Sequence, residues 1–265
     1  MQITFSTDNT PGRPNEDYAI CGPEWAVVLD GATAPQGVDS GCIHDVPWLV
    51  RHLAAGISSR LMLDTLSLPD VLASAIESTC QAHASTCDLH NPDSPSSTVA
   101  IIRVRDESLD YLVLGDSPVI LRKEDGDLVP VTDDRIENLP GGRPYSIEFV
   151  RSMRNKAGGF WIASTDIQAA YHAVSGSATN VADAALVTDG ITRLVEWYGH
   201  DWPEVFTILD TGGPSALIAS VRAAERQSPP SHAKAHDDAT AVYANVLSRT
   251  GKPPRLWRHD VFANS

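Results

Sequence analysis

The sequence predicts an α+β fold in which antiparallel sheets are covered by helices. Short apolar runs joined by hairpin-length turns predict strands at 2–5, 18–21, 25–29, 97–104, 109–116 and 118–123. Helical patterns lie between these two sets of strands and near the end of the chain, and do not alternate with single strands. Because parallel neighbours need long crossover connections, this order favours antiparallel sheets with helices packed outside.

Two helices are expected between the two sets of strands. Asp45 can cap the first helix, and Pro47 fits its first turn. Its apolar residues recur every four positions: Leu49, Leu53, Ile57 and Leu61. The segment starting at Ser67 repeats the start signal, and the second helix is expected to bury Val71, Leu72, Ala75, Ile76 and Thr79.

The second half of the chain starts with a loop-rich stretch at 124–158. After it the patterns predict strands at 158–165, 184–188 and 239–247, and helices at 191–198 and 202–226. We therefore expect one domain over 1–248 and a C-terminal tail over 249–265.

Composition excludes several function classes. The 265 residues carry a formal net charge of −14, which disfavours nucleic acid and anionic membranes as partners. No apolar run approaches the roughly 18 residues that span a bilayer, and the first residues lack a signal-peptide pattern. Four cysteines in a chain of this length do not form a disulfide framework. A cytoplasmic protein is expected.

Acidic residues stand at the ends of four predicted strands. Asp30-Gly31 and Asp189-Gly190 end two strands, whereas Glu16-Asp17 and Asp237-Asp238 precede two others. Each pair alone is compatible with an ordinary turn. Together, on rigid strand ends, they supply the carboxylate and carbonyl oxygens that hard divalent cations bind, which favours Mg²⁺ or Mn²⁺ over Zn²⁺.

Six motifs carry a family resemblance: RPNED (13–17), VVLDGAT (27–33), SSTVA (96–100), LGDSP (114–118), LVTDGIT (186–192) and HDDATAV (236–242). Their order is similar to that of the metal-dependent protein phosphatases, the PPM or type 2C family. The resemblance implies a four-layer α-β-β-α sandwich of two antiparallel sheets. It also implies hydrolysis of phosphoserine and phosphothreonine in proteins by a water that two Mg²⁺ or Mn²⁺ ions activate.

The resemblance also assigns roles to individual residues. Asp30 would bridge two metal ions, the Gly31 carbonyl would bind one, and Asp189 and Asp237 would complete the other. Asp17 would hold bound water, with Glu16 behind it. Arg13 would bind the substrate phosphate.

Three departures from the family pattern affect this assignment. Arg13 lies one residue closer to the first motif Asp than the usual arginine, whose place is taken by Gly12. Arg193 replaces an acidic residue that, with Asp116, commonly holds a third metal ion, so a third ion is not expected. Arg193 could instead pair with Asp116 or reach substrate phosphate, and Asp116 could be only a turn residue. Asp238 stands where Asn is common.

Two further groups of residues could serve a metal or a catalytic step. Cys80, His83, Cys87 and His90 have helical spacing, but one straight helix cannot wrap four ligands around an ion, so helix packing is favoured over zinc binding or redox use. His236 could donate a proton to the leaving oxygen, or be a solvated loop residue.

The sequence therefore favours a metal-dependent protein serine/threonine phosphatase. The alternatives are a phosphatase for a small phosphorylated metabolite, and a weak or inactive member that keeps the fold as a binding module. Arg193 and the displaced Arg13 favour the binding module, whereas the intact Asp30, Asp189 and Asp237 favour the enzyme.

Overall fold

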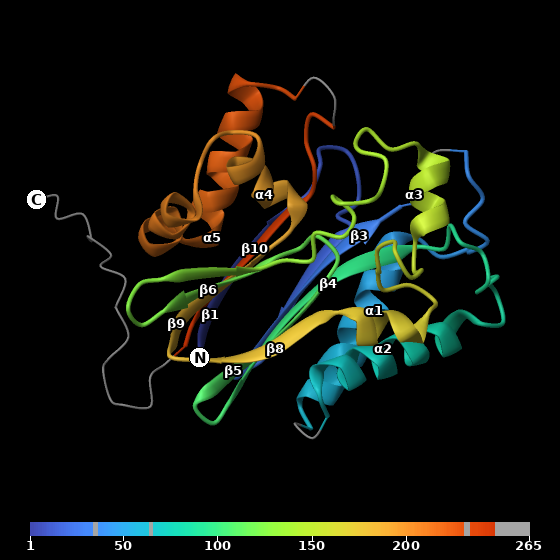
Figure 1. Ribbon diagram of the computed structural model, residues 1–265, viewed down its shortest axis with the longest axis horizontal. Helices are drawn as coiled ribbons and strands as arrows, with labels where there is room; N and C mark the ends of the chain where they lie inside the picture. Colours follow the sequence, from blue (N-terminus) through green and yellow to red (C-terminus); the bar gives the residue numbers. More distant parts are fainter. Residues whose placement is uncertain (34–36, 64–65, 231–233, 247–265) are drawn as a thin grey trace, which may run out of the picture.

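Two five-stranded antiparallel sheets form the centre of the computed structural model, and helices cover their outer faces (Figure 1). The structure describes residues 1–33, 37–63, 66–230 and 234–246. This is the four-layer α+β sandwich that the family resemblance implied. The tail predicted at 249–265 and the last residue of the strand predicted at 239–247 lie outside the described residues.

The first sheet has the strand order β1-β10-β9-β6-β7. Its strands are β1 (Gln2–Asp8), β6 (Val119–Lys123), β7 (Leu128–Val131), β9 (Val181–Val187) and β10 (Ala239–Asn245). The second sheet has the order β2-β3-β4-β5-β8. Its strands are β2 (Asp17–Cys21), β3 (Trp25–Ala32), β4 (Ser96–Arg105), β5 (Ser108–Leu114) and β8 (Val174–Thr179).

Each sheet is covered by its own helices. Helices α1 (Val46–Leu61) and α2 (Leu68–His83) pack on the second sheet, and α4 (Asp189–Glu196) and α5 (Trp202–Gln227) pack on the first. The predicted start signals are confirmed, since the Asp45 carboxylate accepts from the Trp48 N–H and the Ser67 hydroxyl accepts from the Asp70 N–H. The predicted apolar stripes of α1 and α2 are buried.

The central strands bury both faces, which explains their continuous apolar runs. On β3, Val27 and Leu29 face the helices α1 and α2, whereas Ala26 and Val28 lie in the core between the sheets. Side chains of a strand alternate between its two faces, so a strand covered on both sides carries no polar alternation. This packing holds the ends of β3 in a fixed position relative to the first sheet.

The predictions for residues 124–180 were the least accurate. No strand forms at 158–165, where the described backbone makes only isolated bridges, between Ser97 and Ala163 and between Arg154 and Phe160. Phe160 and Ile162 instead pack in a small separate cluster with α3 (Ile147–Met153). The helix α3, the 3₁₀ helix η1 (Ile167–His172), β7 and β8 were not predicted, because they are short and have few buried residues.

The long helix α5 breaks where its sequence contains Gly213-Pro214. Gly213 has a φ of 71° and is not helical, and Pro214 cannot donate to the helical hydrogen bonds that precede it. In the described part of the chain, no helix combines the length and apolar character needed to cross a membrane.

The core between the sheets predicts where truncation is most damaging. Ile102 on β4 is completely buried there, so Ile102→Ala should lower the free energy of unfolding by about 2–5 kcal/mol, measured by urea denaturation. Ile147 on α3 is 59% exposed, so Ile147→Ala should change it by less than about 0.5 kcal/mol. Equal losses in the two variants would contradict this account of the core.

Candidate metal and phosphate site

Three carboxylates from both sheets converge at one edge of the sandwich. Asp17 and Asp30 are partners in the β2–β3 register, so their side chains lie next to each other on the same face. Asp189 follows β9 of the other sheet and begins α4, and its backbone N–H donates to Asp30 Oδ2 at 3.4 Å. We call Asp17, Asp30 and Asp189 the carboxylate cluster.

Burial and mutual repulsion raise the pKa values of this cluster. Burial is the main cause for Asp30, whose pKa is well above its ordinary value, and the charges of Asp189 and Asp17 add to it. Burial raises the pKa of Asp17 to about 8, although hydrogen bonds with Thr240 and Thr188 oppose the increase. Burial also raises the pKa of Asp189 to about 7, with further contributions from other nearby carboxylates.

Asp116 belongs electrostatically to the same edge. It directly follows Gly115 at the end of β5, and burial raises its pKa. Its charge in turn raises the pKa values of Asp30 and Asp189. Asp116 is therefore close enough to Asp30 and Asp189 for its charge to affect both carboxylates.

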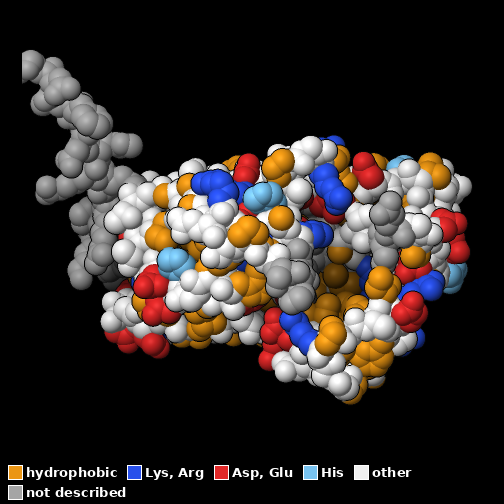
Figure 2. Space-filling view, turned by 90° about the horizontal axis from the view of Figure 1, so that it is seen from above, with side chains coloured by type: hydrophobic (Ala, Val, Ile, Leu, Met, Phe, Trp, Pro, Cys, Tyr) orange, Lys and Arg blue, Asp and Glu red, His pale blue; other side chains and the backbone are white. Residues whose placement is uncertain are grey.

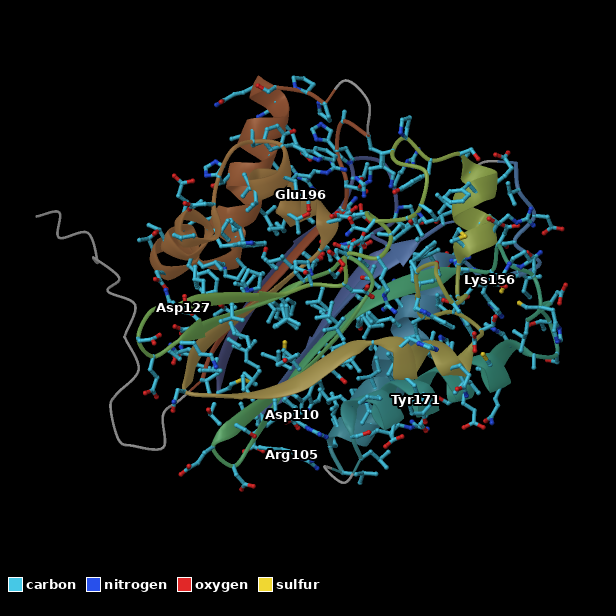
Figure 3. The ribbon with its side chains drawn as sticks, in the orientation of Figure 1. Arg105, Asp110, Asp127, Lys156, Tyr171 and Glu196 are labelled. Atoms are coloured by element: carbon cyan, nitrogen blue, oxygen red, sulfur yellow. The ribbon has the colours of Figure 1, made fainter. Side chains whose placement is uncertain are left out.

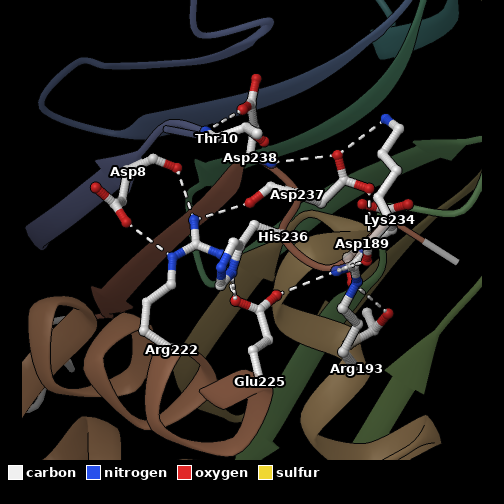
Figure 4. Close-up of polar contacts among 11 residues, drawn as sticks. Asp8, Thr10, Asp189, Arg193, Arg222, Glu225, Lys234, His236, Asp237 and Asp238 are labelled. Carbon is white, nitrogen blue, oxygen red and sulfur yellow. Dashed lines mark hydrogen bonds and ion pairs between the residues drawn. The ribbon is translucent and has the colours of Figure 1, made fainter. Parts of the chain in front are cut away.

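Asp237 differs from the carboxylate cluster because the chain's own cations bind both of its oxygens (Figure 4). Arg193 Nη2 donates to Oδ2 at 2.7 Å, and Lys234 Nζ donates to Oδ1 at 3.0 Å. Arg193 is 3% exposed, and its guanidinium also lies over the Trp197 ring, 4.7 Å from the centroid. The suggested pairing of Arg193 with Asp116 is therefore wrong. Arg193 pairs with Asp237 instead.

Glu225 anchors this arrangement from α5. It is 1% exposed and receives hydrogen bonds from Arg193 at 3.1 Å and from Arg222 at 2.9 Å. His236 Nδ1 lies 2.7 Å from Glu225 Oε2, so this nitrogen of His236 faces Glu225. We call the set that links these side chains the Asp237 network: Arg193, Arg222, Glu225, Lys234, His236 and Asp237.

Sequence reasoning did not find Glu225, Arg222 or Lys234. Lys234 had one signal, since it stands three residues before Asp237, within reach of that carboxylate in a turn. Glu225 and Arg222 had no signal, because a charged pair on an amphipathic helix ordinarily faces solvent.

Asp238 fixes the loop that leads to Asp17. Its Oδ1 accepts from the Thr10 N–H and its Oδ2 from the Glu16 N–H, both at 2.6 Å. The Thr33 hydroxyl donates to the Glu16 side chain, and burial raises the pKa of Glu16. Asp238 therefore has a structural role at this edge.

Arg13 lies on the same loop, with its side chain exposed. It closes a turn in which its N–H donates to the Thr10 carbonyl at 3.1 Å. Pro11 and Gly12, with a φ of +78° at Gly12, occupy the central positions and are typical of a type II turn. The Arg13 charge lowers the pKa of Glu16, although burial outweighs this effect. Arg13 is thus held near Glu16 by a rigid turn.

The glycines behind Asp30 and Asp189 are required by close packing. Neither Gly31 nor Gly190 has a positive φ, so a left-handed backbone is not the reason for them. A Cβ at Gly190 would lie 2.0 Å from the Asp238 carbonyl oxygen, and one at Gly31 would lie 2.6 Å from the Glu16 carbonyl oxygen. Any larger residue would push the strand ends apart.

These residues fit a divalent cation unequally. The carboxylate cluster offers only oxygen donors, crowded at a buried edge where a cation would relieve their repulsion. At Asp237 an ion would have to compete with Arg193 and Lys234. Figure 2 shows that the side of the molecule that faces upward in Figure 1 is hollowed, with acidic and basic side chains along the rim.

Two antiparallel sheets flanked by helices, with carboxylates at one sheet edge, define the class of metal-dependent phosphatases. The sequence model of the family described as Protein phosphatase 2C matches residues 9–221, and the chain belongs to this family. The matched region contains Asp17, Asp30 and Asp189 but ends before Asp237. No curated protein sequence matches the chain significantly.

Solved structures share the fold. The catalytic domain of the serine/threonine protein phosphatase PstP with two manganese ions has a TM-score of 0.60 and 18% identity, covering 93% of this chain and 98% of that chain. The Mycobacterium tuberculosis phosphatase PstP/Ppp has a TM-score of 0.62 and 18% identity, covering 93% and 99%. Stp1 from Staphylococcus aureus has a TM-score of 0.58 and 16% identity, covering 93% and 95%.

The raised pKa values predict that the metal-free protein loses stability as pH rises. Asp17 and Asp189 titrate near pH 4 when unfolded, but near 8 and 7 when folded. The folded state therefore holds these protons more tightly, and this stabilisation disappears as pH rises through the folded pKa values. In excess chelator, the thermal midpoint should fall between about pH 5 and about pH 9.

A neutral side chain at the cluster should reduce that dependence. Asp30→Asn removes one of the repelling charges, so its midpoint should fall less over the same pH range. Asp127 lies at the turn of the β6–β7 hairpin, away from the cluster (Figure 3), and Asp127→Asn should behave like the wild type. A midpoint that rises with pH in the metal-free wild type would refute the electrostatic description.

Proposed function

We propose that this protein is a divalent-metal-dependent phosphomonoester hydrolase that acts on phosphoserine and phosphothreonine in proteins. The observation that carries the proposal is the convergence of Asp17, Asp30 and Asp189 from two different sheets. Family membership supports the same activity. The structurally similar PstP catalytic domain was solved with two manganese ions, which supports Mn²⁺ or Mg²⁺ as the metal.

The side chains of this protein would have different roles in the reaction. The carboxylate cluster would hold the metal ions, and the Thr188 hydroxyl, which donates to Asp17 Oδ2 at 2.9 Å, would orient one ligand. When bound, a pair of such cations lowers the pKa of a water molecule between them, which supplies hydroxide near neutral pH. The Gly31 carbonyl remains a proposed ligand.

Arg13 would bind the substrate phosphate. Its guanidinium is exposed on a rigid turn, and Asp238 ties that turn to β10 through Thr10 and Glu16. A positive charge held in this way offsets negative charge on phosphoryl oxygens without reorganising during the reaction. In this proposal, the rigid turn would compensate for the one-residue shift from the family's usual arginine position.

The Asp237 network supports a second candidate function, a weak or inactive member that binds phosphorylated partners. Arg193 is buried and bound to both Asp237 and Glu225, so an ion at Asp237 must work against a fixed positive charge. Two metal ions are proposed from the family, and Arg193 argues against a third.

A cytoplasmic location, proposed from the sequence, agrees with the four free cysteines.

Loss of one cluster carboxylate should abolish turnover and keep the fold. Asp189→Asn should reduce manganese-dependent hydrolysis of p-nitrophenyl phosphate by more than about 100-fold, because even outer partners of metal ligands contribute 10–100-fold. Asp127→Asn is the matched control and should retain full turnover. If the wild type shows no metal-dependent turnover, the binding module replaces the enzyme; if Asp189→Asn keeps its turnover, Asp189 is outside the site.

Lys234 should weaken metal binding at Asp237. Its side chain is 64% exposed, so Lys234→Ala removes a cation without leaving a buried cavity. Repulsion between the Lys234 charge and a metal ion, screened by water, amounts to about 1 kcal/mol. The manganese concentration for half-maximal turnover should therefore fall roughly fivefold in Lys234→Ala. Lys156→Ala, at a surface lysine near α3 (Figure 3), should not change it. An unchanged or higher manganese requirement in Lys234→Ala would show that Lys234 does not compete with the metal.

The substrate class is tested separately. Turnover of phosphoserine and phosphothreonine peptides above that of sugar phosphates would support the protein phosphatase, whereas the reverse preference would favour the metabolite phosphatase.

A further inference from the structure

A cysteine–histidine cluster lies at the C-terminal end of α2, apart from the carboxylate cluster. Cys42 belongs to the loop between β3 and α1, His83 is the last residue of α2, and Cys87 lies in the turn that follows. The two sulfurs and one ring nitrogen of His83 all lie within 4.8 Å of one another. We call Cys42, His83 and Cys87 the Cys–His cluster.

This arrangement corrects the sequence interpretation of the same residues. A continuous helix would place Cys80, His83, Cys87 and His90 along one stripe, but α2 ends at His83. The chain then turns back, and the Cys87 N–H donates to the His83 carbonyl at 3.0 Å. Cys87 therefore comes beside His83, and Cys42, more than 40 positions away in the sequence, completes the group.

Backbone contacts hold the two loops together without any ion. The Asp88 N–H donates to the Gly41 carbonyl at 2.8 Å, next to the two cysteines. The Asn91 side-chain amide donates to the Asp39 carbonyl at 3.0 Å, so the loop before α1 lies beside the loop after α2, at the right-hand edge of Figure 1. The positions of Cys42 and Cys87 are therefore determined by the fold.

His83 provides the observation that points to a ligand. It is 3% exposed, and neither of its ring nitrogens has a hydrogen-bond partner in the part of the chain that the structure describes. Buried polar atoms are ordinarily paired, so an unpaired imidazole next to two sulfurs requires an explanation. A metal ion bound to one nitrogen would provide a partner.

We propose that the Cys–His cluster binds one zinc ion. Two thiolates and one imidazole are ligands that select zinc over the hard cations expected at the carboxylate cluster. Tetrahedral coordination with ordinary zinc–sulfur bonds separates the two sulfurs by ~3.8 Å, which the cluster can reach with a small contraction. Cys42 and Cys87 are partly exposed, and water takes the fourth position.

The ion would act as a structural link. The loop that carries Cys42 starts directly after β3, whose end holds Asp30 and Gly31. Joining this loop to the end of α2 would anchor it on a helix of the outer layer.

Cobalt titration tests the site, because cobalt bound by thiolates gives a near-ultraviolet charge-transfer absorption that oxygen ligands do not produce. The full-length protein, purified under reducing conditions and freed of metal, should develop this absorption with one equivalent of Co²⁺, and Zn²⁺ should displace it. Cys42→Ser and Cys87→Ser should each weaken binding by at least about 100-fold. Elemental analysis should find one zinc per wild-type chain.

Cys80→Ser is the matched control. Cys80 is on α2, three residues before His83, but its thiol contacts the Thr165 carbonyl at 3.6 Å instead of the cluster. The Cys80→Ser variant should therefore retain the cobalt–thiolate absorption. If His83→Ala fails to fold, Cys42→Ser carries the test, because Cys42 is in a loop and partly exposed.

Two results would overturn the zinc site. They are the absence of thiolate absorption in the reduced wild type, or a loss of absorption in Cys80→Ser equal to that in Cys42→Ser and Cys87→Ser. The experiment is independent of the proposed phosphatase, because the cobalt–thiolate absorption can be present without turnover, and turnover without that absorption.

Discussion

Repulsion between buried carboxylates, held together by two packed sheets, is the constraint on which this edge of the molecule depends. Asp17 and Asp30 are register partners on one sheet, and Asp189 is carried by the other. Protonation or separation would relieve their repulsion, as the raised pKa values show. Separation is opposed by the apolar core between the sheets. A bound cation is the remaining way to stabilise the charged form, so the packing that stabilises the sandwich would also create the affinity for metal that we propose.

The cationic side chains Arg193 and Lys234 pair with Asp237, which distinguishes Asp237 from the carboxylate cluster at the same edge. Arg193 is part of a connected set, because buried Glu225 would be a strongly unfavourable isolated charge without Arg193 and Arg222. The acidic residue that the family pattern places at position 193 would repel both Glu225 and Asp237. The departure at Arg193 and the presence of Glu225 on α5 are therefore two parts of one arrangement. This arrangement neutralises Asp237, whereas the proposed metal ions would neutralise the carboxylate cluster.

Close approach of backbones, and not unusual torsion angles, explains the Asp30-Gly31 and Asp189-Gly190 pairs of this chain. Gly31 packs against the Glu16 carbonyl and Gly190 against the Asp238 carbonyl, so each glycine brings two strand ends together. Cys42 belongs to the connection between β3 and α1, where the proposed zinc site would anchor the part next to α1. The support of the site thus extends from the sheets into the outer helical layer.

The sequence by itself determined the central strands, the two capped helices and the identity of the clustered carboxylates. These depend on local patterns: continuous apolar runs such as 25–29, the caps at Asp45 and Ser67, and acidic residues at strand ends. Short elements with little burial, such as β7 and α3, carry no such pattern. Residues 158–165 resemble a strand but make only isolated bridges in the described structure. Only the tertiary structure decided that Arg193 binds Asp237 and that Cys42 joins His83 and Cys87. The physical reason is that such partners are distant in the sequence, and their contacts exist only after the sheets and helices have packed.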